Sequence, residues 1–104
     1  MKNARKRAMI KARKELSREI VGGEPYEYYA LGKFIVSAPG VCGGRPTFKY
    51  TRIEVEVLLD LLATGMPLEK LLENLQGRVN REAVEEARKL AASLIRREAK
   101  AAAA

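Results

Sequence analysis

The fold is decided by residues 37–65, which read SAPGVCGGRPTFKYTRIEVEVLLDLLATG. This stretch begins with glycines at positions 40, 43 and 44, a density that is typical of a turn. Their spacing is not that of a phosphate-binding loop, so we interpret them as turn residues. An extended segment over 47–53 follows, and the stretch ends in the most apolar helix that the sequence predicts.

The helix predicted over 54–64 is apolar on too many sides for an ordinary surface helix. Its apolar residues are Val55, Val57, Leu58, Leu59, Leu61 and Leu62. At 3.6 residues per turn they cover about 200° of the helix surface, whereas a surface helix needs a stripe of about 100°. We therefore expect this helix to be covered on more than one side, either inside the fold or in a subunit interface. Gly65 is placed to end it.

Two further helices and a hairpin are expected around it. Leucines at spacing i, i+3, i+4, i+7 predict a helix over 67–75. Asn80 can cap a last helix over 80–98, and the alanine-rich tail 99–104 is expected to fray. Upstream, alternating apolar residues predict strands near 26–30 and 33–37. A third strand is needed for stability, and residues 47–53 can supply it from this chain or from a second copy.

A basic helical arm is predicted over 1–22, because alanine or a larger apolar residue recurs every fourth position from Ala4 to Ile20. Residues 1–20 hold eight cations against Glu15 and Glu19, which is +6 of the net charge of +7. These cations are the candidate nucleic-acid-binding residues Lys2, Arg5, Lys6, Arg7, Lys11, Arg13, Lys14 and Arg18. The alternative, which composition leaves open, is a solvated helix that only adds solubility.

The composition argues against an enzyme. The chain has 104 residues, enough for one domain, with no histidine, one aspartate and the single cysteine Cys42. Acid–base catalysis and metal sites need clustered groups of these types, so we expect no catalytic residue, no metal and no cofactor. One cysteine and no predicted membrane span or secretory signal favour the cytoplasm. The high content of charged residues, 32%, is typical of thermophiles.

Three helices ending in a helix–turn–helix pair predict a mainly α, trihelical core over 23–98, with a small β element over 26–53. In DNA-binding versions the start of the last helix meets the bases. Here that segment holds Arg81, Glu82, Glu85 and Glu86, a net charge of −2. Plain helix packing is therefore favoured over base reading. Arg52 lies between two apolar elements, and we expect Glu54 or Glu56 of this chain or of a neighbouring copy to pair with it.

Residues 33–97 resemble a prokaryotic family, the domain of unknown function family 433, which has been linked to VapB-type antitoxins. The matching residues are Ala38, Pro39, Cys42, Gly43, Gly44, Arg45 and Pro46, then Thr51, Arg52, Ile53 and Val55, then 58–62 and Gly65. Two positions depart from the family pattern. Tyr50 stands where the family usually has glycine, and Glu54 where it usually has proline.

The resemblance implies a homeodomain-like trihelical core with a small β element, and a homodimer. It further implies a non-enzymatic antitoxin that neutralises a PIN-like ribonuclease toxin and represses its own gene at double-stranded DNA. We expect the segment TRIEV to pair across the dimer two-fold axis. The residues assigned to the dimer or the fold are Gly43, Gly44, Thr51, Arg52, Ile53, Val55, Val57 and Leu61. The alternative function is a stand-alone DNA-binding regulator that uses the basic arm.

Overall fold

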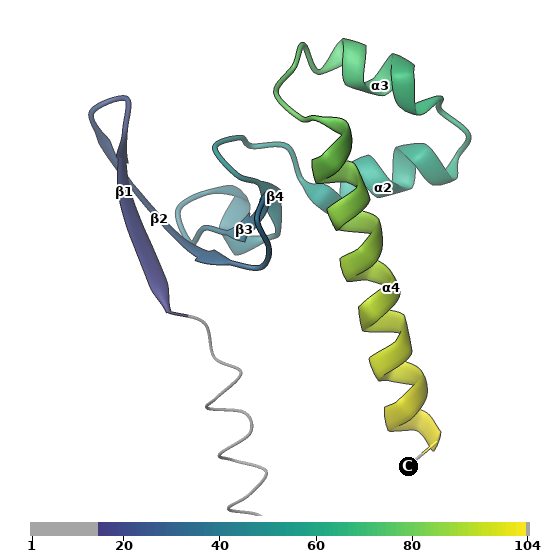
Figure 1. Cartoon of the computed structure of the whole chain (residues 1–104). Coiled ribbons are helices and arrows are strands. Elements are labelled where there is room, and N and C mark those ends of the chain that lie inside the picture. Colours follow the sequence, from purple (N-terminus) through teal and green to yellow (C-terminus); the bar gives the residue numbers. More distant parts are fainter. Residues whose placement is uncertain (1–14, 104) are drawn as a thin grey trace, which may run out of the picture.

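A four-stranded antiparallel sheet and three helices make up the computed structural model, which describes residues 15–103 (Figure 1). The strands are β1 (Leu16–Val21), β2 (Glu24–Ala30), β3 (Ile35–Ser37) and β4 (Thr47–Phe48), and they lie side by side in that order. A short 3-10 turn, η1 (Cys42–Gly44), precedes β4. The helices are α2 (Val55–Ala63), α3 (Leu68–Asn74) and α4 (Arg81–Ala103). The fold is therefore α+β, and the expectation of a mainly α, homeodomain-like trihelical core is wrong.

The largest error concerns residues 16–21, which were expected to be helical and instead form β1. Gly22 and Gly23 were expected to end a helix, but both have positive φ angles, 58° and 82°. Two such residues form the tight turn that suits a β-hairpin, and Val21 accordingly pairs with Glu24 across it. Leu16 and Ile20 fit a helix stripe and one face of a strand equally well, so periodicity alone did not decide between the two. The rest of the predicted arm, residues 1–14, lies outside the described residues.

The strands β2 and β3 agree with the predicted hairpin, and β4 adds the third neighbour from the same chain. Ile35 pairs with Phe48 and Val36 with Thr47. Only the first two residues of the segment 47–53 are in the strand, because the chain turns back at residues 49–51. An isolated bridge between Thr47 and Glu54 then closes this turn against the start of α2.

The main core lies between the sheet and the helices. Ile35 and Phe48 from the sheet pack with Leu58 of α2 and Val84 of α4, and all four are at most 2% exposed. A smaller cluster of Tyr28, Val36 and Ala38 covers the other side of the sheet. The short sheet thus has apolar contacts on both faces, which explains why β3 is buried at both Ile35 and Val36.

The three predicted helices are present with small changes at their ends. The Asn80 side-chain oxygen accepts a 2.8 Å hydrogen bond from the Ala83 amide, so the predicted cap at the start of α4 is confirmed. At the other end, α4 continues to Ala103 and includes most of the tail that was expected to fray. Along α2, Val55 and Leu58 are buried but Val57 is 52% exposed, so the protein itself covers only part of the wide apolar arc.

Candidate interaction surfaces

The glycine-rich turn is a structural corner. Gly43 and Gly44 have φ angles of 64° and 84°, a region that side chains disfavour. The Ser37 hydroxyl donates a 2.6 Å hydrogen bond to the carbonyl of Gly44, which ties the turn to the end of β3. These contacts assign Gly43 and Gly44 to the turn itself, as the sequence predicts.

Arg45, and not Arg52, holds the corner between the turn and α2. The Nε atom of Arg45 lies 2.8 Å from the Glu54 carboxylate. This hydrogen bond lowers the pKa of Glu54 and raises that of Arg45. Arg52 is exposed, and it forms no ion pair with another described residue. Within one chain, the expected pairing of Arg52 is therefore wrong, because Arg45 occupies Glu54 and no ion pair joins Arg52 to Glu56. Pairing of Arg52 with a carboxylate of a neighbouring copy stays a prediction.

Most other residues assigned to the dimer or the fold line the same corner. The Thr51 hydroxyl donates to the Phe48 carbonyl (2.8 Å) and accepts from the Ile53 amide (3.0 Å), which shapes the turn before α2. Val55 is buried at the start of α2, and Leu61 is half-buried on it. Val57 is the member of this set whose apolar side chain is left half exposed. The predicted pairing of two copies through the TRIEV segment remains a prediction.

A cluster of tyrosines joins the β1–β2 hairpin to the turn after β4. The hydroxyls of Tyr28 and Tyr50 both donate to the Glu19 carboxylate, the latter over 2.7 Å. The Lys49 ammonium lies 3.3 Å from the same carboxylate and within 5.0 Å of the ring centres of Tyr28 and Tyr50. The Tyr26 hydroxyl accepts a hydrogen bond from the Tyr50 amide (3.1 Å).

These contacts shift the pKa values of the charged members of the cluster. The hydrogen bond from Tyr28, then that from Tyr50, holds the pKa of Glu19 below its ordinary value of 4.5. Interactions with Tyr28, and then with Tyr50 and Glu19, raise the pKa of Lys49. Glu19 and Lys49 are therefore both charged at neutral pH, and they fix one end of the hairpin to the body.

The start of α4, the candidate base-reading segment, is partly occupied by contacts with the sheet. The Glu86 carboxylate accepts hydrogen bonds from the backbone amides of Lys33 (2.9 Å) and Phe34 (2.8 Å) in the β2–β3 turn. The approach is so close that a Cβ atom at Gly32 would lie 2.5 Å from Glu86 Oε1. Arg81 pairs with Glu69 of α3. These internal roles support the interpretation of this segment as a packing element.

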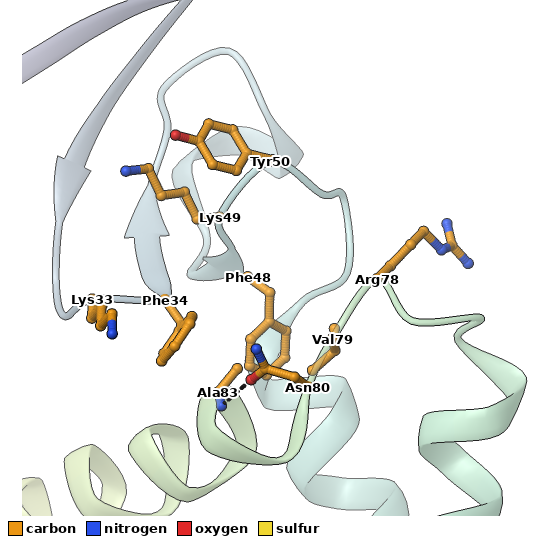
Figure 2. A pocket seen from close by; sticks show the side chains of 9 residues that line it. All are labelled: Lys33, Phe34, Phe48, Lys49, Tyr50, Arg78, Val79, Asn80 and Ala83. Carbon is orange, nitrogen blue, oxygen red and sulfur yellow. Dashed lines mark hydrogen bonds between the residues drawn. The ribbon is translucent and has the colours of Figure 1, made fainter.

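Beside this contact lies an open pocket of about 410 Å³, shown in Figure 2. It is formed where the β2–β3 turn, the turn after β4 and the α3–α4 link meet. Phe34, Phe48, Val79 and Ala83 are its apolar lining residues, and the last three are at most 3% exposed. Figure 2 shows the amine of Lys49 and the guanidinium of Arg78 pointing away from the pocket. The remaining lining residues are Lys33, Tyr50, Arg78 and Asn80.

The C-terminal half of α4 extends well past the core (Figure 1). The last buried residue of this helix is Ala87, sixteen positions before its end at Ala103. Beyond it, Leu94 is 56% exposed and Ile95 is 69% exposed. Two large apolar side chains thus face solvent on a regular helix, where most of their neighbours are alanine or charged residues.

Of the eight predicted nucleic-acid-binding cations, the structure places only Arg18, on β1. Its Nε atom lies 3.7 Å from Glu27 of the neighbouring strand. The other seven lie in residues 1–14, outside the described residues. Residues 15–103 contain 13 lysines and arginines and 13 aspartates and glutamates, so the described part of the chain has no net charge.

Within residues 15–103, no three histidine, cysteine, aspartate or glutamate side chains are grouped as a metal site would require. In the same range, no helix has both the length and the apolarity to cross a bilayer. The residues that build the surfaces above but were missed in the sequence are Glu19, Tyr26, Tyr28, Lys33, Phe34, Lys49, Arg78 and Glu86. Their partners lie up to 53 positions away in the chain, so no local pattern identifies them.

Comparison with known proteins places the chain in a family without assigning it an activity. No curated protein and no solved structure matches it. A family model described as "Protein of unknown function (DUF433)" matches residues 35–91, which run from β3 into the middle of α4. The match includes the glycine turn, the Arg45–Glu54 corner and Glu86, and it begins directly after Lys33 and Phe34, the partners of Glu86. It covers more than half of the chain. The chain therefore belongs to the DUF433 family.

Proposed function

We propose that this protein is a non-enzymatic, dimeric antitoxin-like protein that neutralises a PIN-like ribonuclease toxin by binding it through the C-terminal half of α4. The observation that carries this proposal is the exposure of Leu94 and Ile95 beyond the last buried residue of α4. A helix that presents large apolar side chains to solvent is the form in which helices dock into grooves of partner proteins.

The charges of the same segment indicate the chemistry of the partner. Residues 88–103 contain five cations, Arg88, Lys89, Arg96, Arg97 and Lys100, and one acid, Glu98. A groove with an apolar floor and acidic sides complements such a helix, because opposite charges at the rim steer association and set the orientation. A second copy of this helix would bring like charges together, so it is a poor occupant of this surface.

For the dimer we propose the exposed part of α2 around Val57. This side chain is 52% exposed and lies one turn from the half-buried Leu61. The proposed α2 contact is separate from α4, so a dimer would leave both copies of the projecting helix free. Light scattering after gel filtration measures the mass directly. A particle of 11.6 kDa at micromolar concentration would rule the dimer out.

The toxin proposal is tested by co-expression with the product of the adjacent reading frame and co-purification of the two. Leu94→Asp should weaken capture at least about tenfold, because it places a charge where an apolar contact is lost. Ser93→Asp introduces the same charge on the side of the same turn that faces away from the Leu94–Ile95 pair, and it should leave capture unchanged. Equal capture by both variants, or a neighbour that is not a ribonuclease and does not bind, would refute the proposal.

A second candidate function, a DNA-binding regulator that uses the basic arm, is favoured by the distribution of charge. Residues 1–14 contain seven cations and no acid, which is the entire net charge of +7. A chain that begins at Glu15 keeps β1 intact and removes all of this charge. It should lose retention on double-stranded DNA, together with a salt dependence of about 0.9 in log–log slope per phosphate contact. DNA binding that survives this truncation would reject the arm as the DNA-binding element.

A further inference from the structure

The β1–β2 hairpin extends beyond the rest of the sheet (Figure 1). All six residues of β1 pair with β2, whereas β2 pairs with β3 only at Tyr29 and Ala30. A hairpin of two strands is marginally stable in water, and a third strand is one of the usual means of stabilising it. Within residues 15–103, no strand lies on the outer side of β1. Most of the hairpin therefore lacks a third strand in the described part of the chain.

The two edges of the sheet differ in their capacity to accept a further strand. At β4, which is two residues long, the chain folds back on itself, and the Phe48 amide donates to the Ile53 carbonyl (3.0 Å). Strand β1 has six residues and contains neither proline nor lysine, the residues that commonly block pairing at sheet edges. The sheet can therefore be extended at β1 and not at β4.

The hairpin turn decides which backbone groups of β1 face outwards. In a hairpin with a two-residue turn, the residues that flank the turn exchange backbone hydrogen bonds, and here they are Val21 and Glu24. Every second residue of β1, counted back from Val21, then directs its backbone groups toward β2. The amides and carbonyls of Leu16, Arg18 and Ile20 therefore face away from β2, with the spacing that a further antiparallel strand requires.

The side chains of the same three residues are self-complementary. Leu16 (47% exposed) and Ile20 (69% exposed) lie two positions before and after Arg18, on the same face of β1. If two β1 strands pair in antiparallel fashion about Arg18, Leu16 of each copy lies opposite Ile20 of the other. The two Arg18 side chains then lie opposite each other. Each has Glu27 of its own β2 at 3.7 Å, so the row of four charges is neutral.

We propose that β1 pairs with β1 of a second copy of the chain, in antiparallel orientation and centred on Arg18, so that the two sheets become one. The pairing gives each hairpin its third strand and brings the exposed Leu16 and Ile20 of the two copies together. This contact is separate from the proposed α2 contact around Val57 and from the exposed half of α4. Two different two-fold contacts on one chain produce an assembly larger than a dimer.

Disulfide cross-linking of the full chain tests both the pairing and its register. In a Cys42→Ser background, the Arg18→Cys variant should convert mostly to a covalent dimer on mild oxidation. The reason is that the Cα atoms of a hydrogen-bonded antiparallel pair are about 5.5 Å apart, which a disulfide can span. Glu27→Cys is the matched control, because Glu27 is exposed and lies opposite Arg18 on β2. Its counterpart would be three strand spacings away, roughly 14 Å, so it should not cross-link. Equal cross-linking of the two variants, or none at Arg18→Cys, would overturn the proposal.

Two further comparisons separate this contact from those proposed for the function. The Arg18→Cys cross-link should persist when Val57→Asp or Leu94→Asp is added. Loss of the cross-link with Val57→Asp would show that the β1 strands meet only as a result of the α2 contact, and it would overturn the proposal. Without cross-linking, Ile20→Lys should halve the mass measured by light scattering, whereas Ile20→Val should leave it unchanged. An unchanged mass in Ile20→Lys would also refute the pairing.

Discussion

The Glu86 carboxylate of α4 accepts a 2.8 Å hydrogen bond from the backbone amide of Phe34, which lies 52 residues earlier in the chain. Its second oxygen accepts a 2.9 Å hydrogen bond from the Lys33 amide. One side chain thus satisfies two backbone donors of the β2–β3 turn and joins the sheet to the longest helix. The position of α4 relative to the sheet is therefore set by a specific polar contact as well as by the packing of Val84.

Replacement of Glu86 by alanine should destabilise the protein by about 1 to 2 kcal/mol, because two charge-assisted hydrogen bonds are lost and the turn amides are left without their partner. The measurement is the free energy of unfolding from urea titration. Glu85→Ala is the control, since Glu85 is exposed and its one ion pair within residues 15–103 is with Arg88 on its own helix. A loss in Glu85→Ala as large as that in Glu86→Ala would contradict the assigned contact.

Tyr50 offers a test of backbone strain. Its φ angle is 67°, a region that glycine adopts readily and other residues adopt at a cost. Tyr50→Gly and Tyr50→Ala both remove the ring and its hydrogen bond to Glu19, so they differ chiefly in the backbone. Tyr50→Gly should be more stable than Tyr50→Ala by about 1 kcal/mol in urea unfolding. The order would be reversed if the backbone at this position were unstrained.

The positive φ angle at Tyr50 suits glycine, the residue that the family resemblance leads one to expect at this position. The tyrosine side chain adds stabilising contacts that a glycine does not make, a hydrogen bond to Glu19 and a ring contact with Tyr26 at 5.5 Å between ring centres. We therefore infer that the side-chain contacts of Tyr50 offset the conformational cost of its positive φ angle.

Arg45 and Arg52 look alike in the sequence, but we expect them to contribute differently to stability. Of the two, Arg45 forms the ion pair at the corner before α2. Arg45→Ala should lower the melting temperature, because it removes the 2.8 Å contact with Glu54. Arg52→Ala should leave the melting temperature unchanged, since this side chain is exposed and lacks a charged partner among the described residues. Circular dichroism on heating compares the two variants. A larger effect at Arg52 would show that the corner is held differently in solution.

Acid should loosen the attachment of the β1–β2 hairpin. The pKa of Glu19 in the folded protein lies below its ordinary value of 4.5, so its contribution to stability is present above that value and is lost as the pH falls through the folded pKa. The Gln side chain of Glu19→Gln does not titrate, so this variant should lack the pH-dependent contribution of Glu19. The measurement is the change in the tyrosine side-chain resonances of both proteins, followed by NMR from neutral pH to below 4.5. An identical acid response in the two proteins would exclude Glu19 as its source.

The sequence was informative wherever local chemistry decides the structure. The three helices, the cap at Asn80 and the turn at Gly43 and Gly44 all depend on residues within a few positions of one another, and all were predicted. Residues 16–21 were not, because Leu16 and Ile20 suit either periodicity. The turn at Gly22 and Gly23 decides in favour of the strand, and only the pairing with β2 reveals it.

The surfaces were less predictable because they also depend on contacts between residues that are distant in the chain. The Arg45–Glu54 pair competes with an equally plausible pairing of Arg52, and geometry alone separates the two. The Glu19 cluster draws on β1, β2 and the turn after β4, and the pocket on the sheet and the α3–α4 link. Such sets of residues meet only after the chain has folded.

Because α4 is packed against the core only near its N-terminal end, a small tilt there produces a larger displacement at its C-terminal end. From Ala87 to Ala103 the helix rises roughly 24 Å without a buried residue, so a tilt of about 10° at the core would move its tip by about 4 Å. Contacts in the core-packed part of α4, such as that between Glu86 and Phe34, therefore determine the positions of Leu94 and Ile95. A small rearrangement between the sheet and the first turns of α4 would be amplified into a large displacement at the far end of the molecule.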